Sequence, residues 1–398
     1  MPAIYLDNAS TSRPKPAGVG PAMARAAERL GTPGRGTSAS AREAGAIVSR
    51  LRARLASFIG VTDPDRVILS SSATDALSGA IQSLCTCPPS DSGRPAHVVT
   101  TSIEHNSVRR PLAFAAKQGQ VRVSQVAADH RAVVRAEDVL AAVTDETKLV
   151  AVTLVSNAIG SIQPVREIAR GLRERSSQAL LLVDACQGVG VLDLACEEWG
   201  IDLLAFSGHK ALLGPQGSAA IYVGPRAYAV GDPAAAMNPW VIGGTGLDSE
   251  SPDMPREIPA RFEAGTVNIP GFAGLLAALE DPGRMSASET LAHERRLCAA
   301  FESRVAHLAR VRVLGPAAES RVGMLAISIE GIDPHEVAMA LESDAGVIVR
   351  AGLQCAPGAH AAVGTLESGG AVRISPGPAT TEAEIQACAD AIVRLATE

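Results

Sequence analysis

The stretch LLVDACQGVGVLDLACEEWGIDLLAFSGHK (181–210) holds two short apolar runs, and polar residues follow each run directly. The runs ALLLVDA (179–185) and LLAFS (203–207) have the length and the continuous hydrophobicity of strands that are buried on both faces. Strands of this kind occur in parallel sheets that helices cover on both sides. This stretch therefore predicts a mostly parallel sheet inside a helical shell.

The same pattern extends over the first two thirds of the chain. Further buried strands are expected at RVILS (66–70), HVVTTS (97–102) and KLVAVTLVS (148–156). Helical patterns lie among these strands, at 43–59, 73–84, 107–117, 135–143 and 164–175. Because strands and helices alternate, we predict an α/β fold.

The pattern changes from about residue 284. A long helix (287–308) precedes separated strands at 311–314, 322–330 and 371–375 and a closing helix at 381–396. This order is typical of a smaller α+β domain. We therefore predict a large domain over 17–283 and a small domain made of 1–16 and 284–398, with the N-terminal strand IYLDNA in the small domain.

Composition excludes several classes of protein. The chain has 398 residues and a formal charge of −6, with 46% hydrophobic and 20% charged residues, as in ordinary globular proteins. A mildly acidic chain with 3% aromatic residues is a poor candidate for binding nucleic acid or an anionic membrane. The chain shows no apolar run of membrane-spanning length, and its first residues do not resemble a signal peptide.

The cysteines indicate the cellular compartment. Seven cysteines are scattered along the chain without disulfide-framework or zinc-site spacing, so we predict a cytoplasmic protein with reduced thiols and no metal site. Count and spacing alone do not say which thiol takes part in chemistry.

Polar side chains follow each of the five predicted strands, where ligands bind in open α/β sheets. They are Ser71, Ser72 and Thr74 with Ala73, then Glu104, His105 and Asn106, then Asn157, then Asp184 and Gln187, and finally Ser207, His209 and Lys210. Together they predict a binding site along this edge of the sheet.

Each of these groups has a functional and a structural interpretation. The segment SSSATDAL (71–78) suits a phosphate at a helix N-terminus or is an ordinary helix cap. Asp184 could pair with a protonated ring nitrogen, or it could be a structural carboxylate that is hydrogen-bonded within the protein. Lys210 could form a Schiff base or be a surface lysine on a turn. His105 could stack on a cofactor and pass protons, or be structural.

A phosphate cradle, a carboxylate for a ring nitrogen, a stacking histidine and a partly buried lysine together describe a pyridoxal phosphate site. The chain resembles the fold-type I, class V aminotransferases, and among them the cysteine desulfurases related to NifS and SufS. The resemblance runs from YLDNAST (5–11) to VRISPGPATTEAEI (372–385). Its most specific blocks are VDACQ with SGHK, RFEAGTVN and RAGLQCAPGAH.

This resemblance implies roles for individual residues. Lys210 would bind pyridoxal phosphate covalently, Asp184 would pair with its ring nitrogen, Gln187 would bind its phenolic oxygen and His105 would stack on its ring. The remaining implied cofactor ligands are Ala73, Thr74, Ser207, His209 and, from the partner subunit of a homodimer, Thr266. Asn157 and Arg373 would hold the substrate carboxylate, Arg35 would lie near the site, and Cys355 would be the active-site cysteine.

The implied reaction converts L-cysteine to L-alanine and leaves the sulfur on Cys355 as a persulfide, for delivery to an acceptor such as a protein. The compact loop around Cys355 resembles the SufS-like subgroup. Relatives usually carry histidine directly before this cysteine, whereas this chain has Gln354, whose neutral amide does not exchange protons at physiological pH. If that histidine sets the ionisation of the thiol, this enzyme is slower or suited to another acceptor.

Two other hypotheses remain open at this stage. The first is a related lyase that acts on cystine or selenocysteine, in which Cys355 need not carry sulfur. The second is a binding or regulatory protein that keeps the fold without turnover, against which the joint presence of Lys210, Asp184 and Arg373 argues. Within the desulfurase hypothesis, a dedicated sulfur donor for the biosynthesis of a sulfur-containing metabolite is also open.

Overall fold

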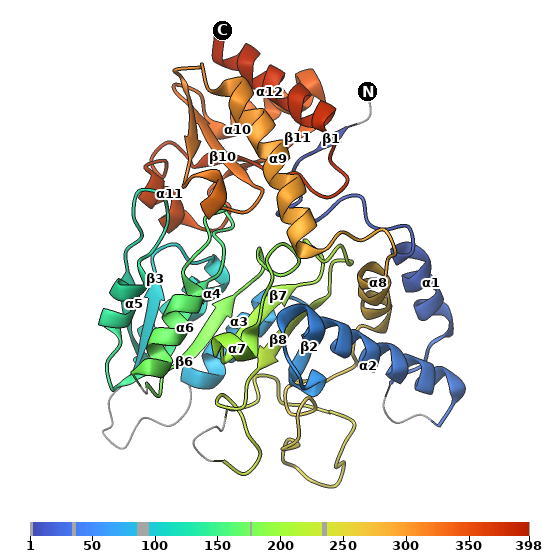
Figure 1. Ribbon diagram of the computed structural model, residues 1–398. Coiled ribbons are helices and arrows are strands. Elements are labelled where there is room, and N and C mark those ends of the chain that lie inside the picture. Colours follow the sequence, from blue (N-terminus) through green and yellow to red (C-terminus); the bar gives the residue numbers. More distant parts are fainter. Residues whose placement is uncertain (1–2, 34–36, 86–94, 176, 233–236, 398) are drawn as a thin grey trace.

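The structure is a computed structural model that describes residues 3–33, 37–85, 95–175, 177–232 and 237–397 (Figure 1). Its strands are β1 (Ile4–Tyr5), β2 (Val67–Ser70), β3 (Ala96–Thr101), β4 (Val121–Val126), β5 (Thr147–Thr153), β6 (Leu180–Asp184), β7 (Leu203–Ser207), β8 (Ala219–Val223), β9 (Val311–Leu314), β10 (Leu325–Ile329), β11 (Val347–Ile348), β12 (Arg350–Gly352) and β13 (Ala371–Ile374). Its α-helices are α1 (Val19–Arg29), α2 (Ala39–Ile59), α3 (Ala73–Cys85), α4 (Asn106–Lys117), α5 (Ala136–Ala142), α6 (Val165–Glu174), α7 (Cys196–Trp199), α8 (Ile269–Leu279), α9 (Ala287–Val305), α10 (Pro334–Ala345), α11 (Pro357–Val363) and α12 (Glu382–Thr397).

The larger sheet has seven strands in the order β2-β8-β7-β6-β5-β3-β4. Strands β3 to β7 pair in parallel with one another, whereas β8 runs antiparallel to both β7 and β2. The predicted mostly parallel sheet is therefore confirmed. The sequence did not reveal β4, which is half exposed and lacks a continuous apolar run, or β8, whose alanines weaken the strand pattern.

Both faces of this sheet are buried. Val150 and Val152 of β5 belong to the apolar cluster that α2 and α6 cover, while Leu149 and Ala151 belong to the cluster that α3 and α4 cover. Neighbouring residues of a strand point to opposite faces. This double burial explains why the strands read as continuous apolar runs.

The C-terminal part forms an antiparallel sheet in the order β12-β13-β10-β9, and α9, α10 and α12 lie beside it (Figure 1). The predicted long helix, the three strands and the closing helix correspond to α9, β9, β10, β13 and α12. Elements α10, β11, β12 and α11 lie between the predicted strands and were not predicted.

The N-terminal strand packs with the C-terminal part. Strand β1 pairs in parallel with β11, and Leu6 lies in one apolar cluster with Leu297 and Ile392. This cluster is separate from the two clusters of the seven-stranded sheet. We therefore propose the same domain division as above, with residues 1–16 joining 284–398.

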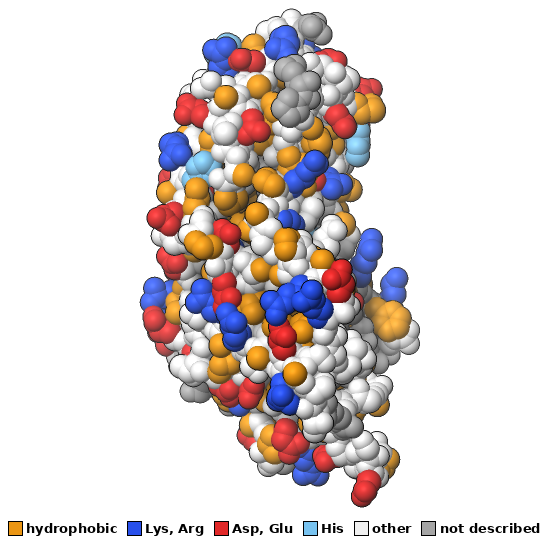
Figure 2. All heavy atoms as spheres, turned by 90° about the vertical axis from the view of Figure 1, so that its right-hand side faces the viewer, with side chains coloured by type: hydrophobic (Ala, Val, Ile, Leu, Met, Phe, Trp, Pro, Cys, Tyr) orange, Lys and Arg blue, Asp and Glu red, His pale blue; other side chains and the backbone are white. Residues whose placement is uncertain are grey.

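Figure 2 shows the side of the molecule on which α1, α2 and α8 lie. Acidic and basic side chains are interspersed there, and Arg25 pairs with Glu43 and Arg50 with Glu280. This face is therefore not a continuous basic surface of the kind that binds nucleic acid. Among the described residues, no helix has both the length and the apolar character needed to span a membrane.

Candidate active site

Most of the predicted strand-end residues line one pocket at the carboxyl edge of the seven-stranded sheet, whereas Ser71, Glu104 and Asn106 do not. The lining residues are Ser72, Ala73, Thr74, Leu77, His105, Ser107, Thr153, Val155, Asn157, Asp184, Cys186, Gln187, Ser207, His209 and Lys210. Every predicted cofactor ligand except Thr266 is among them.

One wall of the pocket is the N-terminus of α3. Ser72 lines the pocket and its Oγ accepts a hydrogen bond from the amide of Asp75 at 3.0 Å, so this serine caps the helix. Ala73 and Thr74 form the first turn, whose backbone amides have no partners within a helix. The structural and functional interpretations of this segment are thus compatible, because a capped helix still presents free amides to an anion.

A second wall is formed by His105, which caps α4. Its Nδ1 accepts a hydrogen bond from the amide of Ser107 at 3.0 Å, so the proton of a neutral ring lies on Nε2. Burial lowers the pKa of His105, which favours this neutral form. The Ser107 hydroxyl also contacts Thr74 Oγ1 at 2.8 Å and so joins the two helix N-termini. Ser107 was not predicted as a site residue, because its place near the start of a helix is its one feature in the sequence.

Asp184 and Lys210 follow neighbouring strands of the sheet. Asp184 ends β6, is 5% exposed, and accepts a hydrogen bond on Oδ1 from the amide of Cys186 at 3.0 Å. Lys210 follows β7, and its side chain makes no hydrogen bond or ion pair with any described residue. Burial raises the pKa of the Cys186 thiol, so this pocket cysteine stays protonated and is a poor nucleophile.

The turn that carries Lys210 is held by the N-terminal segment. The carbonyl of His209 accepts hydrogen bonds from the amide of Ser12 at 3.0 Å and from Lys15 Nζ at 2.8 Å. Burial lowers the pKa of Lys15 to about 8 and that of His209 to about 4. His209 is therefore neutral near pH 7, and its buried Nδ1 has no partner within the described structure.

Glu104 is a buried acid behind the pocket. Its Oε1 accepts hydrogen bonds from Thr101 Oγ1 at 2.6 Å and from the amide of Thr153 at 2.9 Å, while Oε2 has no partner among the described residues. Burial raises the pKa of Glu104 to about 8. The carboxyl is therefore mostly neutral near pH 7, so it does not compete with Asp184 as an anion.

Arg373 and Asn157 lie together at the edge of the pocket. Arg373 is 2% exposed, and it donates to the carbonyl of Asn157 at 2.8 Å, to Asp7 Oδ1 at 2.8 Å and to Ser10 Oγ at 2.7 Å. Its buried Nε has no partner in the part of the chain described. This unpaired N–H can take a further acceptor, such as a carboxylate.

Cys355 lies on a turn that contacts the same edge. Asn157 Nδ2 donates to the carbonyl of Gln354 at 2.6 Å, and the amide of Asn106 donates to the carbonyl of Cys355 at 2.9 Å. Cys355 is exposed, whereas the other free cysteines in the described part of the chain are buried or half-buried. Among the described cysteines, Cys355 alone is both exposed and on a turn that contacts the pocket rim.

Gly358 brings this turn close to the end of β3. A Cβ atom built at Gly358 would lie 1.8 Å from the carbonyl oxygen of Ser102, a distance that no relaxed structure accepts. Replacing Gly358 by alanine should therefore displace the N-terminus of α11 and lower the free energy of unfolding by about 1–3 kcal/mol.

Urea unfolding of Gly358→Ala checks this expectation. Gly45→Ala is the matched control, because an added Cβ meets no atom within 4 Å at this position inside α2, and it should be neutral or stabilising. A Gly358→Ala protein as stable as wild type would show that the contact is not close.

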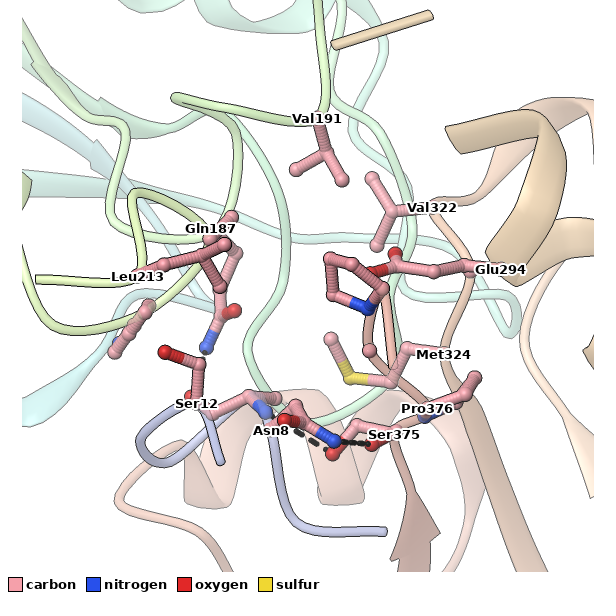
Figure 3. Close-up of a pocket in the computed structure, with 16 residues that line it drawn as sticks. Asn8, Ser12, Gln187, Val191, Leu213, Glu294, Val322, Met324, Ser375 and Pro376 are labelled. Atoms are coloured by element: carbon pink, nitrogen blue, oxygen red, sulfur yellow. Dashed lines mark hydrogen bonds between the residues drawn. The ribbon is translucent and has the colours of Figure 1, made fainter. Parts of the chain in front are cut away.

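A second, smaller cavity lies between the two parts of the fold and shares Gln187 and Lys210 with the first pocket (Figure 3). Glu294 reaches into it from α9, and Val191, Val322 and Met324 line it nearby. Glu294 makes no hydrogen bond or ion pair with any described residue, and burial raises its pKa well above the usual value. Burial thus favours the protonated, neutral form of this carboxyl.

Glu294 should make the stability depend on pH. Since the folded state holds the proton more tightly than the unfolded state, stability is lost as pH rises above the unfolded pKa and toward the folded one. One acid of this kind contributes a slope of up to about 1.4 kcal/mol per pH unit. Glu294→Gln removes this slope, so its stability relative to wild type should increase from pH 6 to pH 9.

Thermal unfolding at several pH values measures this difference. Glu336→Gln on the exposed side of α10 controls for the loss of one negative charge. The melting temperature of Glu294→Gln relative to wild type should rise between pH 6 and pH 9. An equal difference in melting temperature at both pH values would contradict a raised pKa of Glu294.

Arg373 and Cys355 lie at the edge of the pocket and do not line it, and two further predicted residues are not placed at the pocket. Thr266 is exposed and lies beside the GGTG loop, where the amide of Gly265 donates to the carbonyl of Gly244 at 2.8 Å. Arg35 lies outside the described residues, as does Cys87.

Comparisons with known proteins agree with this geometry. Residues 4–388 match the family model Aminotransferase class-V. A probable cysteine desulfurase of Methanothermobacter thermautotrophicus is 33% identical over 99% of this chain and 94% of its own length. A cysteine desulfurase of Haloferax volcanii is 28% identical over 92% of this chain and 84% of its own.

Solved structures show the same fold. The apo structure of a cysteine desulfurase from Thermococcus onnurineus has a TM-score of 0.89 at 27% identity and covers 99% of this chain and 95% of its own. The cysteine desulfurase CsdA from Escherichia coli has a TM-score of 0.85 at 22% identity, with 98% and 94% covered, and so supports the fold alone.

Proposed function

Because this chain belongs to the class-V aminotransferase family and has cysteine desulfurases among its relatives, we propose that it is a pyridoxal phosphate-dependent cysteine desulfurase. It would convert L-cysteine to L-alanine and keep the sulfur on Cys355 as a persulfide. The observation that carries the proposal is the position of Cys355, an exposed thiol on a turn that is hydrogen-bonded to the rim of the Lys210 pocket. The comparisons do not favour the lyase alternative.

The pocket fits pyridoxal phosphate. A phosphate could bind at two places in the pocket. The buried Nδ1 of His209 has no hydrogen-bond partner among the described residues, and the first backbone amides of α3 have no partners within the helix. Asp184 would hold the ring nitrogen in its protonated form, and no described residue makes a hydrogen bond or ion pair with the Lys210 amine that would compete with covalent attachment. The bound cofactor supplies an electron sink for the carbanion that forms at the substrate Cα.

The pocket residues would have separate roles in binding the substrate, in proton transfer and in covering the cofactor. Arg373 and Asn157 would orient the substrate carboxylate, and the unpaired Nε of Arg373 supports this role. The free amine of Lys210 would take the proton from Cα. His105 would cover the cofactor ring as a neutral imidazole, since burial lowers its pKa.

The sulfur step requires the thiolate of Cys355. Its Sγ would attack the sulfur of the substrate, so that a new S–S bond forms while the Cβ–S bond breaks. The electron pair of the broken bond stays with the carbon skeleton, which takes up protons and leaves as L-alanine. A persulfide remains on Cys355 for an acceptor, for which a protein is one candidate.

We propose a homodimer in which Thr266 reaches the site of the partner subunit. Val241, Ile242 and Leu247 flank the GGTG loop and are strongly exposed, with Ile242 at 81%. Because this loop is hydrogen-bonded to the Thr266 segment, the apolar side chains and Thr266 lie on the same surface. An exposed apolar patch of this kind is typical of a protein interface. The cytoplasmic location stays a prediction.

The proposal is tested with purified protein loaded with pyridoxal phosphate. We expect L-alanine and sulfide from L-cysteine in the presence of a reductant, in equal amounts over many turnovers. Protein that holds the cofactor and forms no L-alanine from L-cysteine would refute the proposal. In that case, L-cystine and L-selenocysteine are tested as substrates in the same assay. Turnover of either one would indicate the lyase, and turnover of neither would indicate a protein that keeps the fold without catalysis.

A further inference from the structure

The turn that presents Cys355 has an unusual backbone. Gln354 and Cys355 both have positive φ values, 42° and 61°, and neither residue is glycine. Two successive L-residues rarely adopt the left-handed conformation, because Cβ then lies too close to the neighbouring carbonyl. Such a conformation persists only where its surroundings hold it, so the contacts of this turn are informative.

The side chain of Gln354 is held at both ends of its amide. Oε1 accepts a hydrogen bond from His360 Nε2 at 2.7 Å, and Nε2 donates to the carbonyl of Ala371 at 2.9 Å. Gln354 thus links α11 to β13, with the cysteine turn between them. Nε2 also lies 3.5 Å from the carbonyl of Arg350, and none of these contacts involves the thiol of Cys355.

His360 is fixed as one tautomer. It is fully buried, and burial lowers its pKa to about 4, so the ring is neutral near pH 7. Its Nδ1 lies 2.9 Å from Thr365 Oγ1. Since Nε2 must carry the proton that it donates to Gln354, Nδ1 accepts from the Thr365 hydroxyl. In this row of hydrogen bonds, Thr365 therefore donates to His360, and His360 donates to Gln354.

The backbone of the turn is held from the opposite side. Asn157 Nδ2 donates to the carbonyl of Gln354, and the amide of Asn106 donates to the carbonyl of Cys355. The turn is therefore clamped between the pocket rim and the α11–β13 side. Removing the Gln354 contacts takes away these side-chain hydrogen bonds on the α11–β13 side. The bond from the amide of Ala356 to the carbonyl of Leu353, the packing of Ala356 and the bonds to the pocket rim remain.

We propose that Gln354 is a positioning residue, a donor–acceptor bridge between His360 and Ala371 that locks the left-handed turn presenting Cys355. It is not a proton-transfer group for the thiol. A neutral imidazole also offers one donor and one acceptor, so histidine at this position can make the same bridge. The link from this bridge to sulfur transfer rests on the proposed function, whereas the locking of the turn does not.

The test compares wild type with Gln354→Met, which keeps the length of the side chain and loses both hydrogen bonds, and with Gln354→His, the conservative variant. The first readout is hydrogen exchange of the amides over residues 353–356. Gln354→Met should exchange about tenfold faster or more, from the loss of two hydrogen bonds, and Gln354→His should restore most of the protection. Thr365→Val, which frees the tautomer of His360, should raise exchange in the same direction.

The second readout separates positioning from proton transfer. Persulfide formation on Cys355 in one turnover should fall about tenfold in Gln354→Met and recover in Gln354→His, while exchange of the Cα proton of L-alanine, which needs no cysteine, stays near the wild-type rate. The pH midpoint for alkylation of Cys355 by iodoacetamide should be the same in all three proteins. Circular dichroism confirms that each variant is folded.

Either of two results would overturn the inference. Unchanged hydrogen exchange in both Gln354→Met and Thr365→Val would show that the bridge does not hold the turn. A lower alkylation midpoint in Gln354→His would show that residue 354 acts on the ionisation of the thiol. If wild type forms no persulfide while the exchange pattern follows expectation, the proposed function fails and the locking of the turn stands.

Discussion

Replacing Lys210 by alanine is expected to remove all covalently held pyridoxal phosphate and to lower the rate of L-alanine formation by a factor of about 10³ or more. Lys210 lines the pocket and has no hydrogen-bond or ion-pair partner in the part of the chain that the structure describes, so its amine is available both for attachment and for taking the Cα proton. Borohydride reduction followed by mass spectrometry measures the attached cofactor, and the L-cysteine assay measures the rate.

Lys117→Ala on the exposed side of α4 is the control, since it removes a lysine far along the helix from the His105 end. It should keep both the attached cofactor and the rate. Normal turnover by Lys210→Ala would mean that the assignment of the whole pocket is wrong.

Replacing Cys355 by serine is expected to lower sulfur transfer by a comparable factor, about 10³ or more, because a serine hydroxyl is far less ionised than a thiol at neutral pH. Cofactor binding should be unchanged, since Cys355 does not line the pocket. Rapid mixing with L-cysteine and quantification of L-alanine within one turnover measures the effect.

The matched control is Cys388→Ala, which removes a buried cysteine from α12. It should leave the rate near that of wild type. Full turnover by Cys355→Ser would instead show that this cysteine does not carry the sulfur. It would favour the lyase hypothesis, with cystine or selenocysteine as the substrate.

Much of the pocket is predictable from the sequence because it is built locally. Asp184 and Lys210 directly follow strands, and the carboxyl ends of parallel strands meet at one edge of the sheet. Recognising buried strands was therefore enough to bring the strand-end residues together. The same reasoning gave β6 and β7 their limits within one or two residues.

The contacts that hold Arg373 and Cys355 were not predictable. Arg373 pairs with Asp7, 366 positions away in the chain, and Asn157 reaches the carbonyl of Gln354, 197 positions away. No local pattern encodes such pairings, because they depend on how the N-terminal strand and the C-terminal part pack onto the pocket. Glu104 was predicted as one of the strand-end residues, but the sequence did not show that burial raises the pKa of its carboxyl. Glu294 was overlooked altogether, because its raised pKa comes from burial and not from the neighbouring sequence.

Gln354 illustrates how structure changes the interpretation of one residue. From the sequence, a glutamine in place of histidine suggested a missing proton-transfer group beside the thiol. In the structure, its amide is occupied by His360 and the carbonyl of Ala371. The substitution therefore exchanges one donor–acceptor side chain for another, and we infer that the geometry of the turn is what the position preserves.

The most direct test of the account is the mass of the Cys355 peptide. Wild-type protein loaded with pyridoxal phosphate is mixed with one equivalent of L-cysteine, quenched with an alkylating agent, digested and analysed by mass spectrometry with and without prior reduction. We predict one additional sulfur atom on the Cys355 peptide, formed together with L-alanine and removed by the reductant. L-Alanine formed without any additional sulfur on Cys355 would contradict the account.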